Sequence, residues 1–201
     1  MRRIIPFLPI LLLVAIPGCS DPPTAPDEPA TFKTSFSGHE SGRLVASGQL
    51  REGEWKVSFG GHADRGVDGS FRGSWQAQLH SVSVTALEGG HFVATEILGL
   101  NFLASDNPAE CTARANLYMA GTLDGVPGYR ARVLAADAGR IGDDAFDTFR
   151  LVIYDTDAVP LYDTSTSDPA RPGGDFPAVS NCRGGGRAAL AHGNVRIWFT
   201  E

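Results

Sequence analysis

The fold is decided by one stretch, Phe71-Arg72-Gly73-Ser74-Trp75-Gln76-Ala77-Gln78-Leu79. Its apolar side chains all fall on odd positions, and every even position is polar. Alternation with a period of two gives an extended chain one apolar face and one polar face. The stretch is therefore predicted to be an antiparallel β-strand with one face buried and the other in water.

The same alternation continues along the chain, and no stretch of twelve residues shows the apolar stripe of a helix. Further strands are predicted at residues 43–50, 55–59, 114–123, 129–135, 148–154 and 195–199. Residues 81–87 and 91–102 are predicted to form a hairpin that turns at Glu88-Gly89-Gly90. Residues 163–186 lack alternation and are predicted to be a long loop. The pattern predicts an all-β fold, either an antiparallel β-sandwich or a partly closed barrel, of about nine to ten strands.

The N-terminus has the form of a bacterial lipoprotein signal. Arg2 and Arg3 are basic, an apolar segment follows at residues 4–16, and Gly18 precedes Cys19. The apolar segment is shorter than the roughly 20 residues of a membrane-spanning helix, and two prolines interrupt it. We expect residues 1–18 to be a cleaved signal peptide and Cys19 to be lipidated. An ordinary secretory signal is the alternative.

This signal predicts an extracytoplasmic protein of the bacterial cell envelope, attached to the membrane through its lipid anchor. Ser20, which follows the lipidated cysteine, favours placement of the protein at the outer membrane or the cell surface. Residues 19–30 are rich in proline and acidic residues and are expected to be a disordered tether. Residues 31–201 suffice for a single all-β domain. The formal charge of -6 becomes -8 without Arg2 and Arg3, which argues against nucleic acid as a partner.

Cysteine usage agrees with export. The chain has three cysteines, and after lipidation of Cys19 the remaining pair is Cys111 and Cys182. Thiols oxidise outside the cytoplasm, so a Cys111–Cys182 disulfide is predicted. Two separate thiols are the alternative.

Several short blocks occur in an order and spacing that resemble a family of exported bacterial β domains. They are residues 57–60, 79–85, 121–129, 147–151 and 190–197. The chain resembles the post-choice-of-anchor β domain family over most of residues 41–198. The resemblance implies a small all-β module on an exported protein, and it brings no catalytic residues with it. Residues 101–112 and 163–187 depart from the family pattern as added loops, and each contains one of the paired cysteines.

Aspartates gather in one part of the chain and raise the question of a calcium site. They are Asp143, Asp144, Asp147, Asp155, Asp157, Asp163 and Asp168. Calcium prefers oxygen ligands, and Asp155, Asp157 and Asp163 are the candidate ligands. The alternative is that these residues are solvated turn aspartates and strand-end caps. The five histidines lack the close spacing of a zinc site, and no Gly-x-Ser-x-Gly nucleophile motif is present.

Exposed aromatic residues are the remaining candidates for ligand contact. Tyr154 and Tyr162 flank the acidic segment, and Trp198 is out of phase with the apolar residues of its predicted strand. Three functions follow. The first is a lipid-anchored module that binds or supports an envelope protein or glycan without catalysis. The second is a calcium-dependent glycan-binding module. The third is a hydrolase whose carboxylates converge only in the folded chain.

Overall fold

The computed structural model describes residues 41–104, 111–139, 147–165, 172–177 and 187–199. These residues all belong to one compact unit, Thr34–Glu201. Cys19, Cys182 and the predicted signal peptide and tether lie outside the described residues. None of the described residues belongs to a helix of the length and apolarity needed to cross a membrane.

The described chain is almost entirely β-structure, as the alternation predicted. Its strands are β1 (Gly42–Glu52), β2 (Trp55–Arg65), β3 (Phe71–Ser81), β4 (His91–Ala104), β5 (Ala113–Leu123), β6 (Val126–Asp137), β7 (Thr148–Tyr154), β8 (Pro160–Ser165), β9 (Gly173–Phe176), β10 (Ala188–Ala189) and β11 (His192–Phe199). One 3-10 helix, η1 (Thr85–Leu87), precedes β4. The predicted all-β class is confirmed.

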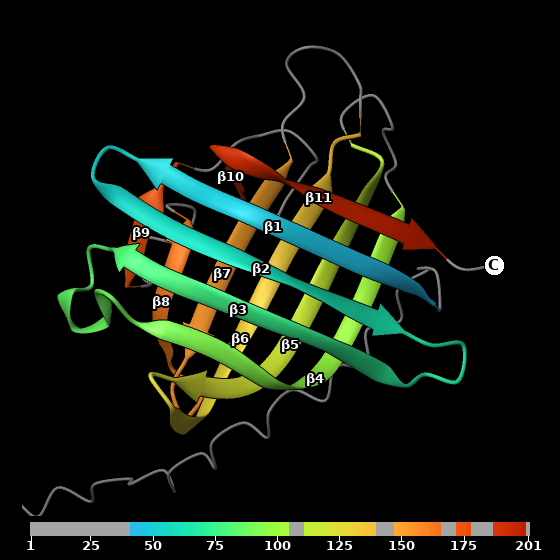
Figure 1. The fold of residues 1–201 in the computed structure, drawn as a ribbon, viewed down its shortest axis with the longest axis horizontal. Coiled ribbons are helices and arrows are strands. Elements are labelled where there is room, and N and C mark those ends of the chain that lie inside the picture. The colour runs from blue at the N-terminus through green and yellow to red at the C-terminus, as the bar shows by residue number, and fades with distance from the viewer. Residues whose placement is uncertain (1–40, 105–110, 140–146, 166–171, 178–186, 200–201) are drawn as a thin grey trace, which may run out of the picture. The chain divides into compact units, whose positions relative to one another are not determined.

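All of these strands belong to one sheet. The strand order is β11-β1-β2-β3-β4-β5-β6-β7-β8-β9, and the short β10 pairs with β7. Neighbours are antiparallel except for β8 and β9, which pair in parallel. Figure 1 shows how this sheet curls, so that β11, β1, β2 and β3 form one layer that crosses in front of β5 to β8. The result is a half-barrel whose two layers enclose the core.

The sheet turns from one layer to the other at β4. Only the first residues of β4 pair with β3, from His91 to Val93, whereas its pairing with β5 runs on to Ala104. The register shifts twice in between, at Ala94/Glu96 and at Ile97/Gly99. Irregularities of this kind bend a strand and increase its twist. They let β4 belong to both layers.

The core is an apolar cluster between the layers, and three aromatic rings lie at its centre. Phe59 of β2 stacks on Phe149 of β7, with ring centroids 3.6 Å apart and planes 1° from parallel. The Trp75 ring lies parallel to both, 6.3 Å from Phe59 and 6.2 Å from Phe149. Phe59 and Trp75 occupy the inward positions of alternating strands, so the period-two pattern directs them into this stack.

The structure corrects two of the predicted elements. Residues 82–87 are not a strand, because the Leu87 N–H donates to the Val84 carbonyl and closes a tight turn. The predicted loop at residues 163–186 holds the end of β8 and all of β9. Asp163, Thr164 and Ser165 are all buried in β8, so polar residues on both faces hide the alternation.

Candidate functional site

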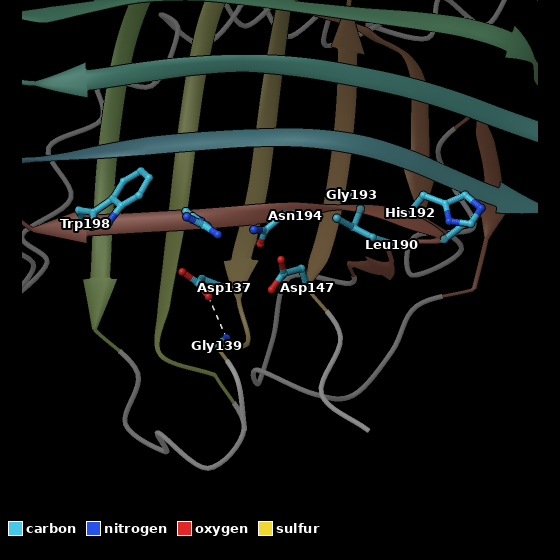
Figure 2. Close-up of a pocket in the computed structure, with 10 residues that line it drawn as sticks. Asp137, Gly139, Asp147, Leu190, His192, Gly193, Asn194 and Trp198 are labelled. Atoms are coloured by element: carbon cyan, nitrogen blue, oxygen red, sulfur yellow. Dashed lines mark hydrogen bonds between the residues drawn. The ribbon is translucent and has the colours of Figure 1, made fainter. Parts of the chain in front are cut away.

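The candidate site is a pocket of about 500 Å³ beside β11 and the ends of β6 and β7. β11 is the last strand of the sheet path and pairs along one edge with β1. The pocket is lined by Asp137, Gly139, Asp147, Leu190, Ala191, His192, Gly193, Asn194, Arg196 and Trp198. Figure 2 shows His192, Asn194 and Trp198 spaced along β11, with Asp137 and Asp147 beside that strand.

Alternation along β11 presents polar side chains to solvent. Val195 and Ile197 are buried in the core, whereas His192, Asn194, Arg196 and Trp198 are exposed. Trp198 keeps 46% of its surface accessible, as its position out of phase with the apolar residues predicted. An exposed tryptophan beside amide, imidazole and guanidinium groups combines a flat apolar face with hydrogen-bonding groups.

The two pocket carboxylates attach β11 to the other layer of the sheet. Asp147 Oδ2 accepts the Val195 N–H at 2.6 Å, and Asp137 Oδ2 accepts the Ile197 N–H at 3.1 Å. Their other oxygens accept N–H groups next to β6, from Ala138 on Asp147 and from Gly139 on Asp137. An edge strand has unpaired N–H groups, and here the carboxylates bind two of them.

The electrostatics of the pocket reflect the burial of Asp147. Burial raises the pKa of the Asp147 carboxyl, and the nearby Asp137 carboxylate adds to the increase. The hydrogen bonds from Val195 and Ala138 and the charge of Arg196 oppose it. A raised carboxyl pKa is also typical of general acids in hydrolases. In this pocket, however, each oxygen of both carboxylates accepts a backbone N–H, so both groups have a structural task.

Gly193 allows β11 to approach β1 closely. It faces Gly48 in the strand register and has a φ of 116°, a conformation that other residues rarely adopt. A Cβ atom at Gly193 would collide with the backbone of Ser47 and Gly48. The glycine thus sets the position of the strand that carries the pocket's side chains.

The three predicted calcium ligands have other partners or lie apart. Asp155 Oδ1 accepts the N–H groups of Asp157 and Val159 in the β7–β8 turn. Asp157 is exposed in that turn. Asp163 is fully buried and accepts hydrogen bonds from Arg150, with Nε 2.8 Å from Oδ1. Within the described ranges, no group of three or more His, Cys, Asp or Glu residues could hold a metal ion.

The three predicted ligand-binding aromatics do not form one platform. Tyr162 is fully buried and donates its hydroxyl hydrogen to Asp175 Oδ2 at 2.9 Å, so it belongs to the core. Burial strongly raises the pKa of the Tyr162 hydroxyl. Tyr154 faces Arg130 at one end of β6, whereas Trp198 lines the pocket with Asp137 at the other end. Seven residues of strand separate the two positions by roughly 20 Å. Trp198 alone lies in the pocket.

The other predicted site residues are the cysteines. Cys111 is buried just before β5, and its predicted partner Cys182 lies outside the described residues. The disulfide therefore stays a prediction, as does the lipidation of Cys19.

Comparison with known proteins adds no assignment: no family model, curated protein or solved structure matches the chain. The resemblance to exported β domains accordingly stays a proposal.

Proposed function

We propose that this chain is a non-catalytic binding module of the bacterial cell envelope, anchored through lipidated Cys19, and that the pocket along β11 binds a glycan. The exposed Trp198 beside Asn194, Arg196 and His192 carries this proposal. A pyranose ring has an apolar face that packs on an aromatic ring, and its hydroxyl groups exchange hydrogen bonds with amides and guanidinium groups.

The attachment of β11 supports binding without chemistry. Val195 and Ile197 alternate with the pocket side chains, and their N–H groups are fixed by Asp147 and Asp137. A rigid strand presents its side chains in one arrangement before the ligand arrives, which reduces the ordering cost of binding. The carboxylates thus contribute to the site by holding the strand.

The proposal is tested by titrating the mature protein with soluble neutral oligosaccharides in a calorimeter. We expect a saturable heat of binding that is lost in Trp198→Ala. Trp55→Phe is the matched control, because Trp55 lies half-buried on β2 and lines no part of the pocket. Its titration should match that of the wild-type protein. Unchanged affinity in Trp198→Ala, or no binding by the wild-type protein across the panel, would overturn the proposal.

A further inference from the structure

A second cluster of polar and aromatic side chains lies on the outer face of β5, β6 and β7. Ala131, Val133 and Ala135 of β6 are buried in the core, so Arg130 and Arg132 at the alternate positions face outward. Leu134 and Ala136 farther along the strand are buried as well. Arg132 faces Tyr118 across the β5–β6 register, and Arg130 faces Tyr154 across the β6–β7 register. We call Tyr118, Arg130, Arg132 and Tyr154 the Arg–Tyr patch.

Arg132 is held in place by its neighbours. Its guanidinium carbon lies 5.3 Å from the centroid of the Tyr118 ring, and its Nη2 donates to Asn116 Oδ1 at 3.5 Å. Burial raises the pKa of the Tyr118 hydroxyl against the opposing charge of Arg132, with a further increase from Tyr154. Arg132 therefore lies over Tyr118, and the neighbouring Arg130 lies opposite Tyr154. A guanidinium fixed by an aromatic ring loses little freedom when it binds an anion.

The patch is positively charged on an acidic protein. The ion pairs between described residues join Arg43 to Asp64 and Arg150 to Asp163. Arg130 and Arg132 pair with no carboxylate of the described residues. Their positions on one face of β6 are about 7 Å apart, the spacing of alternate residues in a strand. Two neighbouring guanidinium groups match a carboxylate, which accepts hydrogen bonds from such donors.

We propose that the Arg–Tyr patch is a second binding site, for a uronic-acid residue of an acidic glycan. The sugar carboxylate binds Arg130 and Arg132, and the pyranose face packs on Tyr154, which is half-exposed at the end of β7. Charge selects the carboxylate and the aromatic ring selects the sugar. A sugar is favoured over a lipid headgroup as the source of the carboxylate, because the two guanidinium groups lie beside the Tyr154 ring, on which a pyranose face can pack. This site shares no residue with the β11 pocket.

Affinity electrophoresis of the mature protein in native gels tests the proposal. Polygalacturonate in the gel is the acidic probe, and neutral galactan is its uncharged counterpart. We expect polygalacturonate to retard the wild-type protein, with its affinity lowered at least about tenfold in Arg130→Gln and in the Arg130→Gln/Arg132→Gln double variant. Any retardation by galactan through the β11 pocket should be the same in both variants and the wild-type protein. Arg130 is exposed, so the single variant keeps the test valid should loss of the Arg132–Tyr118 contact impair folding.

Arg51→Gln is the matched control, because it removes one exposed arginine from β1, outside the patch. It should migrate as the wild-type protein does. Equal loss in Arg51→Gln would show attraction by net charge alone, and undiminished retardation of the double variant would place the site elsewhere. Stronger sedimentation with anionic than with neutral phospholipid vesicles, together with no retardation by polygalacturonate, would identify a lipid surface and overturn the proposal. Trp198→Ala should bind polygalacturonate with wild-type affinity. The failure of this proposal can therefore be distinguished from the failure of the proposed β11 site.

Discussion

Asp163 illustrates how a residue's environment decides its role. It is fully buried in β8, and both of its oxygens bind the Arg150 guanidinium, which is itself only 11% exposed. Removing one partner of a buried pair leaves an uncompensated charge at a cost of about 3–5 kcal/mol. We therefore expect Asp163→Asn to lower the free energy of unfolding by that amount in a urea titration.

The surface pair Arg43–Asp64 is the control for this effect. Its side chains are 54% and 39% exposed, and exposed pairs contribute about 0–1 kcal/mol. Asp64→Asn should therefore change the free energy of unfolding by less than about 1 kcal/mol. Equal decreases in the free energy of unfolding of Asp163→Asn and Asp64→Asn would show that the buried pair stabilises the fold no more than the surface pair does.

Ala158 has an unfavourable backbone conformation in the β7–β8 turn. Its φ is 62°, in the left-handed region that costs most residues about 1–2 kcal/mol. Glycine removes this cost but adds freedom to the unfolded chain. We expect Ala158→Gly to raise the free energy of unfolding by about 0.5–1 kcal/mol in chemical denaturation.

The reverse change at Gly69 tests the same physics. Gly69 has a φ of 79°, and a Cβ there would meet no atom within 4 Å, so backbone conformation alone is at stake. Gly69→Ala should destabilise the protein by about 1 kcal/mol. A neutral or opposite effect at both positions would contradict the strain assigned to Ala158.

At the scale of elements, the attachment of β11 predicts a pH dependence. Burial raises the pKa of Asp147 above its ordinary value of 3.8, so the folded state binds this proton more tightly than the unfolded chain. The associated stability is present below pH 3.8 and is lost as pH rises through the folded-state pKa. The Asp147→Asn variant lacks this proton, so the wild-type protein should lose stability relative to it as pH rises above 3.8.

Urea titrations of both proteins across this pH range measure the difference. Asparagine retains one acceptor oxygen, so loss of a hydrogen bond from Val195 or Ala138 adds a constant offset of about 0.5–1.5 kcal/mol. The slope with pH is therefore the diagnostic quantity. A difference that is constant with pH would contradict the pKa increase assigned to Asp147.

The contacts of the predicted calcium ligands in and near the β7–β8 turn give an expectation for calcium binding. Calcium at about 100 times its dissociation constant would stabilise the folded protein by roughly 2.7 kcal/mol. Because Asp155 Oδ1 already binds two N–H groups and Asp163 binds Arg150, we expect the same melting temperature in chelator, calcium and magnesium. A rise with calcium alone would place a calcium site in this protein, and Asp157→Asn would then test whether the turn holds it.

Local patterns account for the strands better than for the site. The alternation at residues 71–79 correctly predicted β3, because each side chain's burial follows from its position in the strand. Trp198 was found by the same reasoning. Asp137 and Asp147 gave no such signal, since they bind β11 residues 60 and 48 positions away. Their role depends on how the sheet curls, which no local spacing encodes.

At the scale of the whole molecule, the two layers depend on each other. β2 and β7 lie in different layers, and the stacked rings of Phe59 and Phe149 join them. Asp137 and Asp147 join the layers again at the open edge, where β11 meets the ends of β6 and β7. Apolar stacking at the centre and hydrogen bonds at the edge therefore close a sheet that its backbone pairing leaves open.

The predicted Cys111–Cys182 disulfide would add a covalent constraint to this half-barrel. Closing a loop of about 70 residues stabilises a fold by up to about 4 kcal/mol, because it restricts the unfolded chain. We expect neither cysteine to react when the denatured protein is alkylated without reductant, and both to react after reduction. Reduction should also lower the melting temperature. Because Cys111 is fully buried, Cys182→Ser should expose its thiol to alkylation on unfolding. Alkylation of both cysteines without reductant would establish two separate thiols.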